Sequence, residues 1–297
     1  MCFFRIQIYD GPMAVKRLET HIKGSQGQEL YLQTWTPDED QIKGSLLLTH
    51  GQAEHSDCYQ KLADELSREG WRIFAWDLTG HGRSEGRRGY IDHFSTYVND
   101  LEKVVRYLRQ ENTLDNQPFI LFSHSMGGLI ALEALLDKDL GPITAAVFSS
   151  PALGFAFEPP GLKKTLAQIA NKVFPQLTLY NEVSYSVLSR DEEMLKTYPK
   201  DTLRHSRISP AVFFGFLEGF ERIPKEAHNL DLPIFFQLPG EDQLISTPAS
   251  KAVFEKLPNA KNRMEIYHDS FHEIYNDLDR DRVISDLKNF INSFVTA

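Results

Sequence analysis

Short apolar runs alternate along the chain with longer amphipathic stretches, and this alternation predicts strands and helices in turn. Eight apolar runs are typical of strands: Val15–Ile22, Glu29–Thr36, Ser45–Thr49, Trp71–Trp76, Pro118–Ser123, Ile143–Ser149, Pro233–Leu238 and Arg263–Tyr267. Five stretches have apolar residues at helical spacing: Tyr59–Glu69, Phe94–Gln110, Met126–Leu136, Pro248–Glu255 and Asp279–Thr296. Because each of these helices follows a strand, we predict an α/β fold with a mostly parallel eight-stranded sheet flanked by helices.

The connection between the first two predicted strands is a Gly-rich turn, Gly24-Ser25-Gln26-Gly27. A turn this short cannot form a parallel crossover, so we expect an antiparallel hairpin at one edge of the sheet.

A much longer segment separates the sixth and seventh predicted strands. Roughly eighty residues lie between Ser150 and Pro233, whereas connections within such folds are commonly about 2–6 residues long. The segment contains two apolar groups at helical spacing, Leu162, Leu166, Ile169, Val173 and Phe174 beside Lys163, Lys164 and Lys172, and later Phe213, Phe214, Phe216 and Phe220. We therefore expect an inserted helical cap, whose apolar residues either pack it onto the sheet or meet lipid.

The predicted organisation has four parts. Residues 1–14 form an N-terminal extension to which we assign no function, and 15–151 form the first part of the core. Residues 152–228 form the cap, and 229–297 complete the core.

The charge and composition narrow the function classes. Among the 297 residues, 32 Lys and Arg stand against 41 Asp and Glu, a formal charge of -9 that disfavours nucleic acid as a partner. Two cysteines, Cys2 and Cys58, are too few for a disulfide framework. A signal peptide requires an uninterrupted apolar region, but Arg5 and Gln7 interrupt the apolar patch at the N-terminus. We therefore do not interpret this patch as a signal peptide. We expect a cytoplasmic protein without a membrane-spanning helix.

The strongest chemical motif is Ser123-His124-Ser125-Met126-Gly127-Gly128, between an apolar strand and a helix. A nucleophile elbow requires small residues two positions before and two after the nucleophile, because the serine occupies a sharp strand-to-helix turn. Ser123 stands where glycine is usual, which is a minor departure. The motif predicts Ser125 as the nucleophile of an acyl-transfer reaction.

A serine nucleophile needs a histidine base and an acid that orients it, in the chain order Ser, acid, His. The loop after the seventh strand contains Glu241 and Asp242, and either could be the acid. The loop after the eighth strand contains His268 and His272. Their spacing also suits a helical metal pair, but they follow a strand and no further ligand cluster lies nearby, so we expect no metal.

Two backbone N–H groups should stabilise the developing oxyanion, those of Met126 and Gln52. Gln52 lies in the loop His50–Ser56, directly after the third strand. We interpret His50 and His55 as hydrogen-bonded supports of that loop. The turn Asp77–Gly86 follows the fourth strand and is interpreted as a structural turn near the site.

These motifs together resemble the α/β-hydrolase superfamily, and in particular its monoacylglycerol lipase and lysophospholipase branch. The resemblance covers about Lys16 to Val295 and rests on four motifs: the HGxxEHS loop, the DxxGHGxSxG turn, the HSMGG elbow and the stretch Tyr267–Asn276. It implies that His272, which precedes a glutamate, is the base and that Asp242 is the acid. We also expect Glu54 and His124, which lie within two of the motifs, to bind substrate.

The resemblance implies a serine hydrolase that cleaves carboxylic esters of glycerol, most simply monoacylglycerols, without metal or organic cofactor. A lysophospholipase and a non-catalytic lipid-binding protein of the same fold are the alternatives. The sequence departs from the family where many members have an arginine after this loop, because it has Asp57-Cys58-Tyr59 there. Further expectations are a lipid ester substrate and transient contact of the cap with a membrane surface; the sequence sets no oligomeric state.

Overall fold

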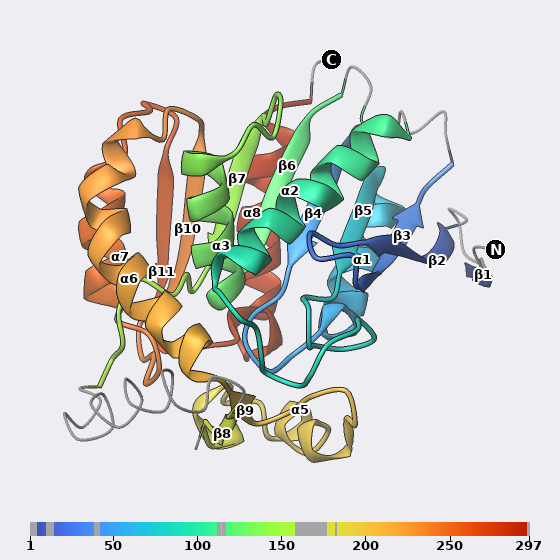
Figure 1. Ribbon diagram of the computed structural model, residues 1–297. Coiled ribbons are helices and arrows are strands. Elements are labelled where there is room, and N and C mark those ends of the chain that lie inside the picture. Colours follow the sequence, from blue (N-terminus) through green and yellow to red (C-terminus); the bar gives the residue numbers. More distant parts are fainter. Residues whose placement is uncertain are drawn as a thin grey trace.

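A nine-stranded sheet forms the centre of the molecule, and helices cover both of its faces (Figure 1). The structure is a computed structural model that describes residues 5–9, 15–38, 42–111, 114, 117–157, 177–181 and 183–295. The strands of this sheet are β1 (Arg5–Tyr9), β2 (Val15–Lys23), β3 (Glu29–Thr36), β4 (Gly44–Thr49), β5 (Trp71–Trp76), β6 (Phe119–His124), β7 (Ala145–Ser149), β10 (Ile234–Pro239) and β11 (Arg263–Tyr267). The eight predicted strands are therefore confirmed, with bounds that shift by at most two residues.

The five predicted helices are also present. The α-helices are α1 (Gln60–Arg68), α2 (Ser95–Gln110), α3 (Met126–Asp137), α5 (Glu192–Leu195), α6 (Pro210–Glu226), α7 (Thr247–Phe254) and α8 (Arg280–Asn292). Short 3-10 helices lie at Ser56–Tyr59, Tyr185–Val187, Tyr198–Lys200, Ala227–Asn229 and Ile274–Asn276. Among the described residues no helix is both long enough and apolar enough to cross a bilayer.

The strand order is β1-β2-β3-β5-β4-β6-β7-β10-β11. From β5 onward the neighbours pair in parallel, whereas β2 and β3 form the predicted antiparallel hairpin. The strand β1 is a correction to the sequence analysis, which treated residues 1–14 as an extension and placed the hairpin at the sheet edge. Arg5 pairs with Glu19 and Tyr9 with Val15, because the outer edge of β2 offers unpaired backbone groups to another strand.

Alternating side chains of the central strands fill two separate cores. In β4, Leu47 packs with residues of α2, α3, α6 and α7 on one face. Leu46 and Leu48 point to the other face, where they pack with α1 and α8. Because both faces are covered, the central strands are apolar throughout, which is why they appear in the sequence as continuous runs.

The segment between β7 and β10 contains α6, which packs closely on the core. A Cβ at Gly219 would lie 2.5 Å from Leu129 of α3, and one at Gly215 would lie 2.2 Å from Phe94, so both glycines permit close approach. Ser209 caps α6 by accepting the N–H of Val212. The apolar face of α6 therefore packs the cap onto the sheet layers, which confirms one of the two interpretations for this part of the cap.

The rest of the described cap is less helical than predicted. Strands β8 (Leu179–Tyr180) and β9 (Arg207–Ile208) form a two-stranded ribbon next to the short helix α5 (Figure 1). The ribbon pairs backbone N–H and C=O groups that a loop would leave to solvent. The spacing of apolar residues in this segment did not indicate such strands. The predicted helical run Leu162 to Phe174 lies outside the described residues.

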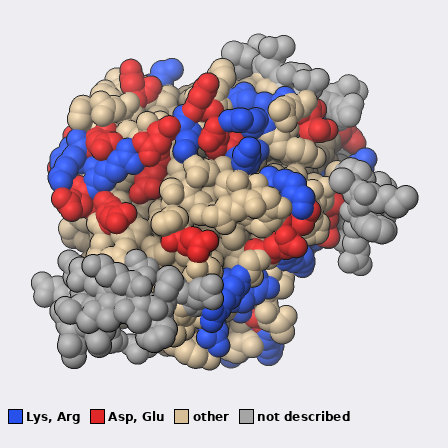
Figure 2. Space-filling model, viewed as in Figure 1, with Lys and Arg blue, Asp and Glu red and all other residues tan. Residues whose placement is uncertain are grey.

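Charged side chains of both signs are interspersed on the face drawn in Figure 2. Ion pairs also bring the two signs together: Arg222 of α6 pairs with Asp137 of α3 and with Glu226. Among the described residues, such mixing leaves no continuous positive tract on this face for a phosphate backbone to follow.

Candidate active site

The candidate catalytic residues follow the carboxyl ends of four parallel strands in the same sheet, in which β7 separates β6 from β10. Ser125 follows β6, the loop of Gln52 follows β4, Asp242 follows β10 and His272 follows β11. In an open α/β sheet the carboxyl ends of the strands form the crevice where ligands bind. The topology thus brings together residues that lie up to 220 positions apart, from Gln52 to His272.

Ser125 occupies a strained turn between β6 and α3. Its φ is 52° and its ψ is -118°, a backbone conformation that residues other than glycine rarely adopt. A Cβ at Gly127 would lie 2.4 Å from the carbonyl oxygen of Thr49, which explains the glycine two positions after the serine. Ser123 lies in strand β6 and does not have a positive φ. The serine in place of glycine is therefore accommodated without backbone strain.

An unbroken hydrogen-bond chain joins Ser125, His272 and Asp242. The Nε2 atom of His272 lies 2.9 Å from Ser125 Oγ, and its Nδ1 atom lies 2.7 Å from Asp242 Oδ2. The other carboxylate oxygen of Asp242 accepts the N–H groups of Leu244 and Ile245 at 2.8 and 3.0 Å. The carboxylate is thereby fixed in the orientation that holds the imidazole against the serine.

The two competing residues lie outside this chain of contacts. Glu241 and His268 are both exposed. The structure therefore brings together the pair that the family resemblance implied, Asp242 and His272, and leaves the sequence neighbours on the surface.

The electrostatics of the pair favour a charged acid and a basic imidazole. Burial alone would lower the pKa of His272, but the charge and hydrogen bond of Asp242 outweigh it and raise that pKa above its ordinary value. Burial likewise opposes ionisation of Asp242, but His272 and the two backbone N–H donors keep its pKa below its ordinary value. His272 is thus a stronger base than a free imidazole.

The loop after β4 is held rigidly beside the serine. His50 contacts the Gly51 carbonyl through Nδ1 and accepts the N–H of Leu78 through Nε2, at 2.7 and 3.0 Å. Ala53 has a φ of 68°, the left-handed region where glycine is favoured. The Gln52 side chain donates to the Arg207 carbonyl of the cap at 2.7 Å.

Met126 is the first residue of α3. The first N–H groups of a helix have no acceptor within the helix, so the N–H of Met126 can donate a hydrogen bond to an oxyanion.

Glu54 and His124, expected to bind substrate, are both buried. Glu54 accepts hydrogen bonds from the N–H of Gly51 and from the hydroxyl of Tyr59. The Nδ1 atom of His124 lies 3.0 Å from Ser149 Oγ. The centroid of the His124 ring is 4.9 Å from the centroid of the His272 ring. These contacts support the loop and the base from behind; contact with substrate stays a prediction for both residues.

Two supports of the site escaped sequence analysis. Ser150 directs its hydroxyl to the carbonyl of His272 at 2.7 Å, and it has a positive φ of 46°. Arg204 of the cap reaches Glu273, the residue after the base, at 3.0 Å. The pair Ser149-Ser150 at the end of a buried strand is a weak sequence signal for the role of Ser150. No local sequence pattern indicates the role of Arg204.

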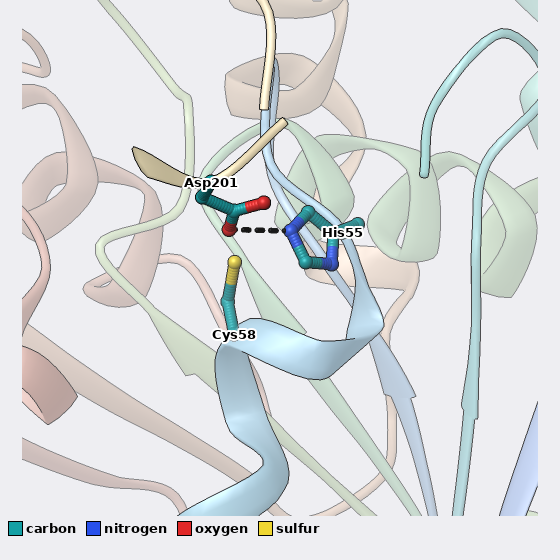
Figure 3. A group of neighbouring side chains, drawn as sticks. All are labelled: His55, Cys58 and Asp201. Atoms are coloured by element: carbon teal, nitrogen blue, oxygen red, sulfur yellow. Dashed lines mark hydrogen bonds and ion pairs between the residues drawn. The ribbon is translucent and has the colours of Figure 1, made fainter. Parts of the chain in front are cut away.

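Three potential metal ligands, His55, Cys58 and Asp201, converge beside this loop (Figure 3). Their ligand atoms lie within 4.8 Å of one another. His55 Nε2 already shares a 2.8 Å hydrogen bond with Asp201 Oδ2, and Arg204 Nε lies 3.9 Å from the same oxygen. A guanidinium at that distance disfavours a second cation, and burial raises the pKa of the Cys58 thiol, whereas a metal requires the thiolate. We interpret the group as a tie between cap and loop.

The sheet, the elbow and the Ser125–His272–Asp242 chain define a serine hydrolase of the α/β-hydrolase fold. The family model described as serine aminopeptidase, S33, matches residues 40–279, and the chain belongs to this family. Within the superfamily it is similar to proteins named monoacylglycerol lipase.

Named relatives cover nearly the whole chain. The monoacylglycerol lipase of Mycolicibacterium smegmatis is 28% identical over 93% of this chain and 98% of its own length. The human monoglyceride lipase is 29% identical over 87% of this chain and 84% of its own. The crystal structure of the Paleococcus ferrophilus monoacylglycerol lipase superposes with a TM-score of 0.78 at 28% identity, covering 90% of this chain and 99% of that one.

Proposed function

We propose that the protein hydrolyses monoacylglycerols to a fatty acid and glycerol through an acyl-serine intermediate, with Ser125, His272 and Asp242 as its catalytic residues. The observation that carries the proposal is the hydrogen-bond chain from Ser125 Oγ through His272 to Asp242, at 2.9 and 2.7 Å. The similarity to named monoacylglycerol lipases supports the choice of substrate.

Acylation begins when His272 Nε2 takes the proton of Ser125 Oγ and the oxygen attacks the ester carbonyl carbon. Asp242 stabilises the resulting imidazolium. The carbonyl oxygen becomes an oxyanion, to which the N–H groups of Gln52 and Met126 donate hydrogen bonds. When the tetrahedral intermediate collapses, the bond to the glycerol oxygen breaks and His272 gives its proton to that oxygen.

Deacylation repeats these steps with water as the nucleophile. His272 takes a proton from water, the hydroxide attacks the acyl carbon, and the bond to Ser125 Oγ breaks as the proton returns to the serine. The fatty acid leaves and the site is restored. No step needs a group beyond the residues described, so the proposed reaction uses neither metal nor organic cofactor.

We propose residues 152–228 as a cap whose outer surface meets lipid. Leu179 and Tyr180 of the ribbon are 48% and 68% exposed, and the neighbouring Leu177 is 40% exposed. Arg207 lies beside them, 5.4 Å from the Tyr180 ring. Exposed apolar side chains next to a cation suit transient contact with an anionic bilayer, from which a poorly soluble ester would be drawn.

The test is turnover of a lipid panel by the wild-type protein and the Ser125→Ala variant. The proposal predicts release of fatty acid from a monoacylglycerol, with lysophosphatidylcholine cleaved more slowly, and no release by the variant. Faster cleavage of the lysophospholipid would replace the proposed substrate class. Wild-type protein inactive on every ester would overturn the proposed chemistry.

A further inference from the structure

One arginine of the cap is buried between the two loops that complete the candidate site. The Arg204 side chain is 5% exposed. Its Nη1 and Nη2 atoms donate to the two carboxylate oxygens of Glu273 at 3.0 and 3.3 Å, and Nη2 lies 3.9 Å from Glu54 Oε2. The guanidinium also lies 4.1 Å from the ring centroid of Tyr198. A planar guanidinium with two hydrogen bonds to one buried carboxylate fixes the orientation of that carboxylate, and at 3.9 Å it is also a counter-ion for the second.

Each carboxylate is directly coupled to a catalytic group. Glu273 follows His272 in the chain, and it also accepts hydrogen bonds from the Tyr198 hydroxyl at 2.6 Å and the Asn276 amide at 2.9 Å. Glu54 accepts the N–H of Gly51, the residue before the oxyanion donor Gln52. A displacement of either carboxylate therefore moves the base or the oxyanion donor.

Arg204 belongs to a segment of the cap, residues 198–205, that we call the strap. The strap has two further ties to the same loop: Asp201 bonds His55 at 2.8 Å (Figure 3), and the N–H of His205 donates to the Ala53 carbonyl at 3.1 Å. These ties hold the loop after β4, whereas among the described residues of the strap Arg204 alone contacts both that loop and the loop of His272.

We propose that Arg204 is a positioning residue for ester hydrolysis: it sets the base loop and the oxyanion loop against each other and makes their alignment depend on a seated cap. Without the guanidinium, two buried carboxylates would be left without their counter-ion, and such a pair relaxes by moving apart or by taking up a proton. Either response shifts His272 or Gln52. The proposal rests on the proposed function only in using Ser125, His272 and Gln52 as the reacting site.

The test compares Arg204→Met, Arg204→Lys and Arg222→Met on p-nitrophenyl butyrate, a water-soluble ester that does not need the lipid-binding surface. Arg222 is a matched control, because it also pairs with two carboxylates and joins the cap to the core, through Asp137 of α3. We expect Arg204→Met to lower kcat about 10- to 100-fold with little change in KM, as misplacement of a catalytic group does. Arg204→Lys should recover part of kcat, and Arg222→Met should keep near wild-type kcat.

The double variant Arg204→Met/Glu273→Gln separates positioning from general damage. Since the two residues act as one unit, its kcat should fall no further than that of Arg204→Met alone. Wild-type kcat in a folded Arg204→Met or Arg204→Lys protein, or an equal loss in Arg222→Met, would overturn the proposal. If Arg204→Met does not fold, Arg204→Lys decides alone, with a 3- to 10-fold lower kcat expected. Failure of the monoacylglycerol assay with retained p-nitrophenyl butyrate activity would count only against the proposed substrate.

Discussion

The hydroxyl of Ser150 donates a hydrogen bond to the backbone carbonyl of His272 at 2.7 Å, so the end of β7 holds the base from behind. Ser150 is buried and adopts a positive φ of 46°. A non-glycine residue in that conformation persists only where its surroundings hold it, and such strain gathers at functional sites. The base of the proposed triad is therefore located both by its acid and by a strand that carries no reacting group.

Ser150→Ala should reduce kcat on p-nitrophenyl butyrate about 10-fold, because the carbonyl of His272 loses a buried donor and its loop can shift. Ser250→Ala is the matched control, since Ser250 is equally buried and donates to the Pro151 carbonyl at 3.3 Å. Steady-state kinetics of both variants checks this. Equal kcat values for the two variants would show that the Ser150 hydrogen bond does not position the base.

The acid limb of the pH profile reports the protonation of His272. Catalysis needs the neutral imidazole, so kcat/KM falls as the pH drops through the pKa of His272. Since Asp242 raises that pKa above its ordinary value despite burial, the midpoint of the acid limb should lie above pH ~6.5.

Asp242→Asn removes the charge that raises the pKa of His272, and burial then dominates. The midpoint of the acid limb should move to lower pH, and kcat should fall by about 10⁴-fold as in a serine protease that lost its triad acid. Glu241→Gln is the control and should leave the profile in place. A midpoint that moves upward in Asp242→Asn would contradict the assigned role.

Gly127→Ala should destabilise the fold as well as the site. The new Cβ would lie 2.4 Å from the Thr49 carbonyl and 2.5 Å from that of His50, and backbone cannot turn aside as a side chain can. We expect a loss of about 1–3 kcal/mol in the free energy of unfolding, measured by urea titration. Gly24→Ala, whose Cβ would meet a side chain, the Gln28 amide, at 2.5 Å, should cost less because a side chain can shift more readily than backbone. A greater loss in Gly24→Ala would refute this account of the elbow.

Contact of the cap with lipid predicts that Leu179→Ser/Tyr180→Ser weakens binding to anionic vesicles. Each exposed apolar side chain contributes about 1.5–3 kcal/mol when fully buried, so losing two should lower co-sedimentation at least 10-fold. Leu278→Ser is the control, because Leu278 is also exposed (63%) but lies outside the cap. Activity on p-nitrophenyl butyrate should be unchanged in both. Wild-type protein that fails to sediment with vesicles at low salt would remove the membrane-contact idea.

The sequence predicts the parts of this molecule whose chemistry is local. The elbow is visible because a sharp turn demands small residues around Ser125, and the central strands are visible because burial on both faces makes them apolar. The pair Asp242 and His272 needed more than spacing, because Glu241 and His268 have the same chemistry one and four positions away.

What the sequence missed depends on contacts between distant segments. Strand β1 reads as an extension since its pairing partner, not its composition, makes it a strand, although Arg5-Ile6-Gln7-Ile8-Tyr9 alternates polar and apolar residues. Arg204 joins Glu54 and Glu273, which lie 150 and 69 positions away, and no single-sequence pattern records such an ion pair.

The most direct test of the central claim is labelling by a fluorophosphonate probe, read by intact mass, because the probe forms a covalent adduct only with an activated serine. Wild-type protein and Ser123→Ala should each gain one adduct, since Ser123 lies within strand β6 and its buried hydroxyl makes no hydrogen bond to the base. Ser125→Ala should gain none and should release no fatty acid from monoacylglycerol, the loss in kcat reaching about 10⁶-fold as in another serine hydrolase. An adduct on Ser125→Ala, or loss of labelling in Ser123→Ala with Ser125 intact, would contradict the account.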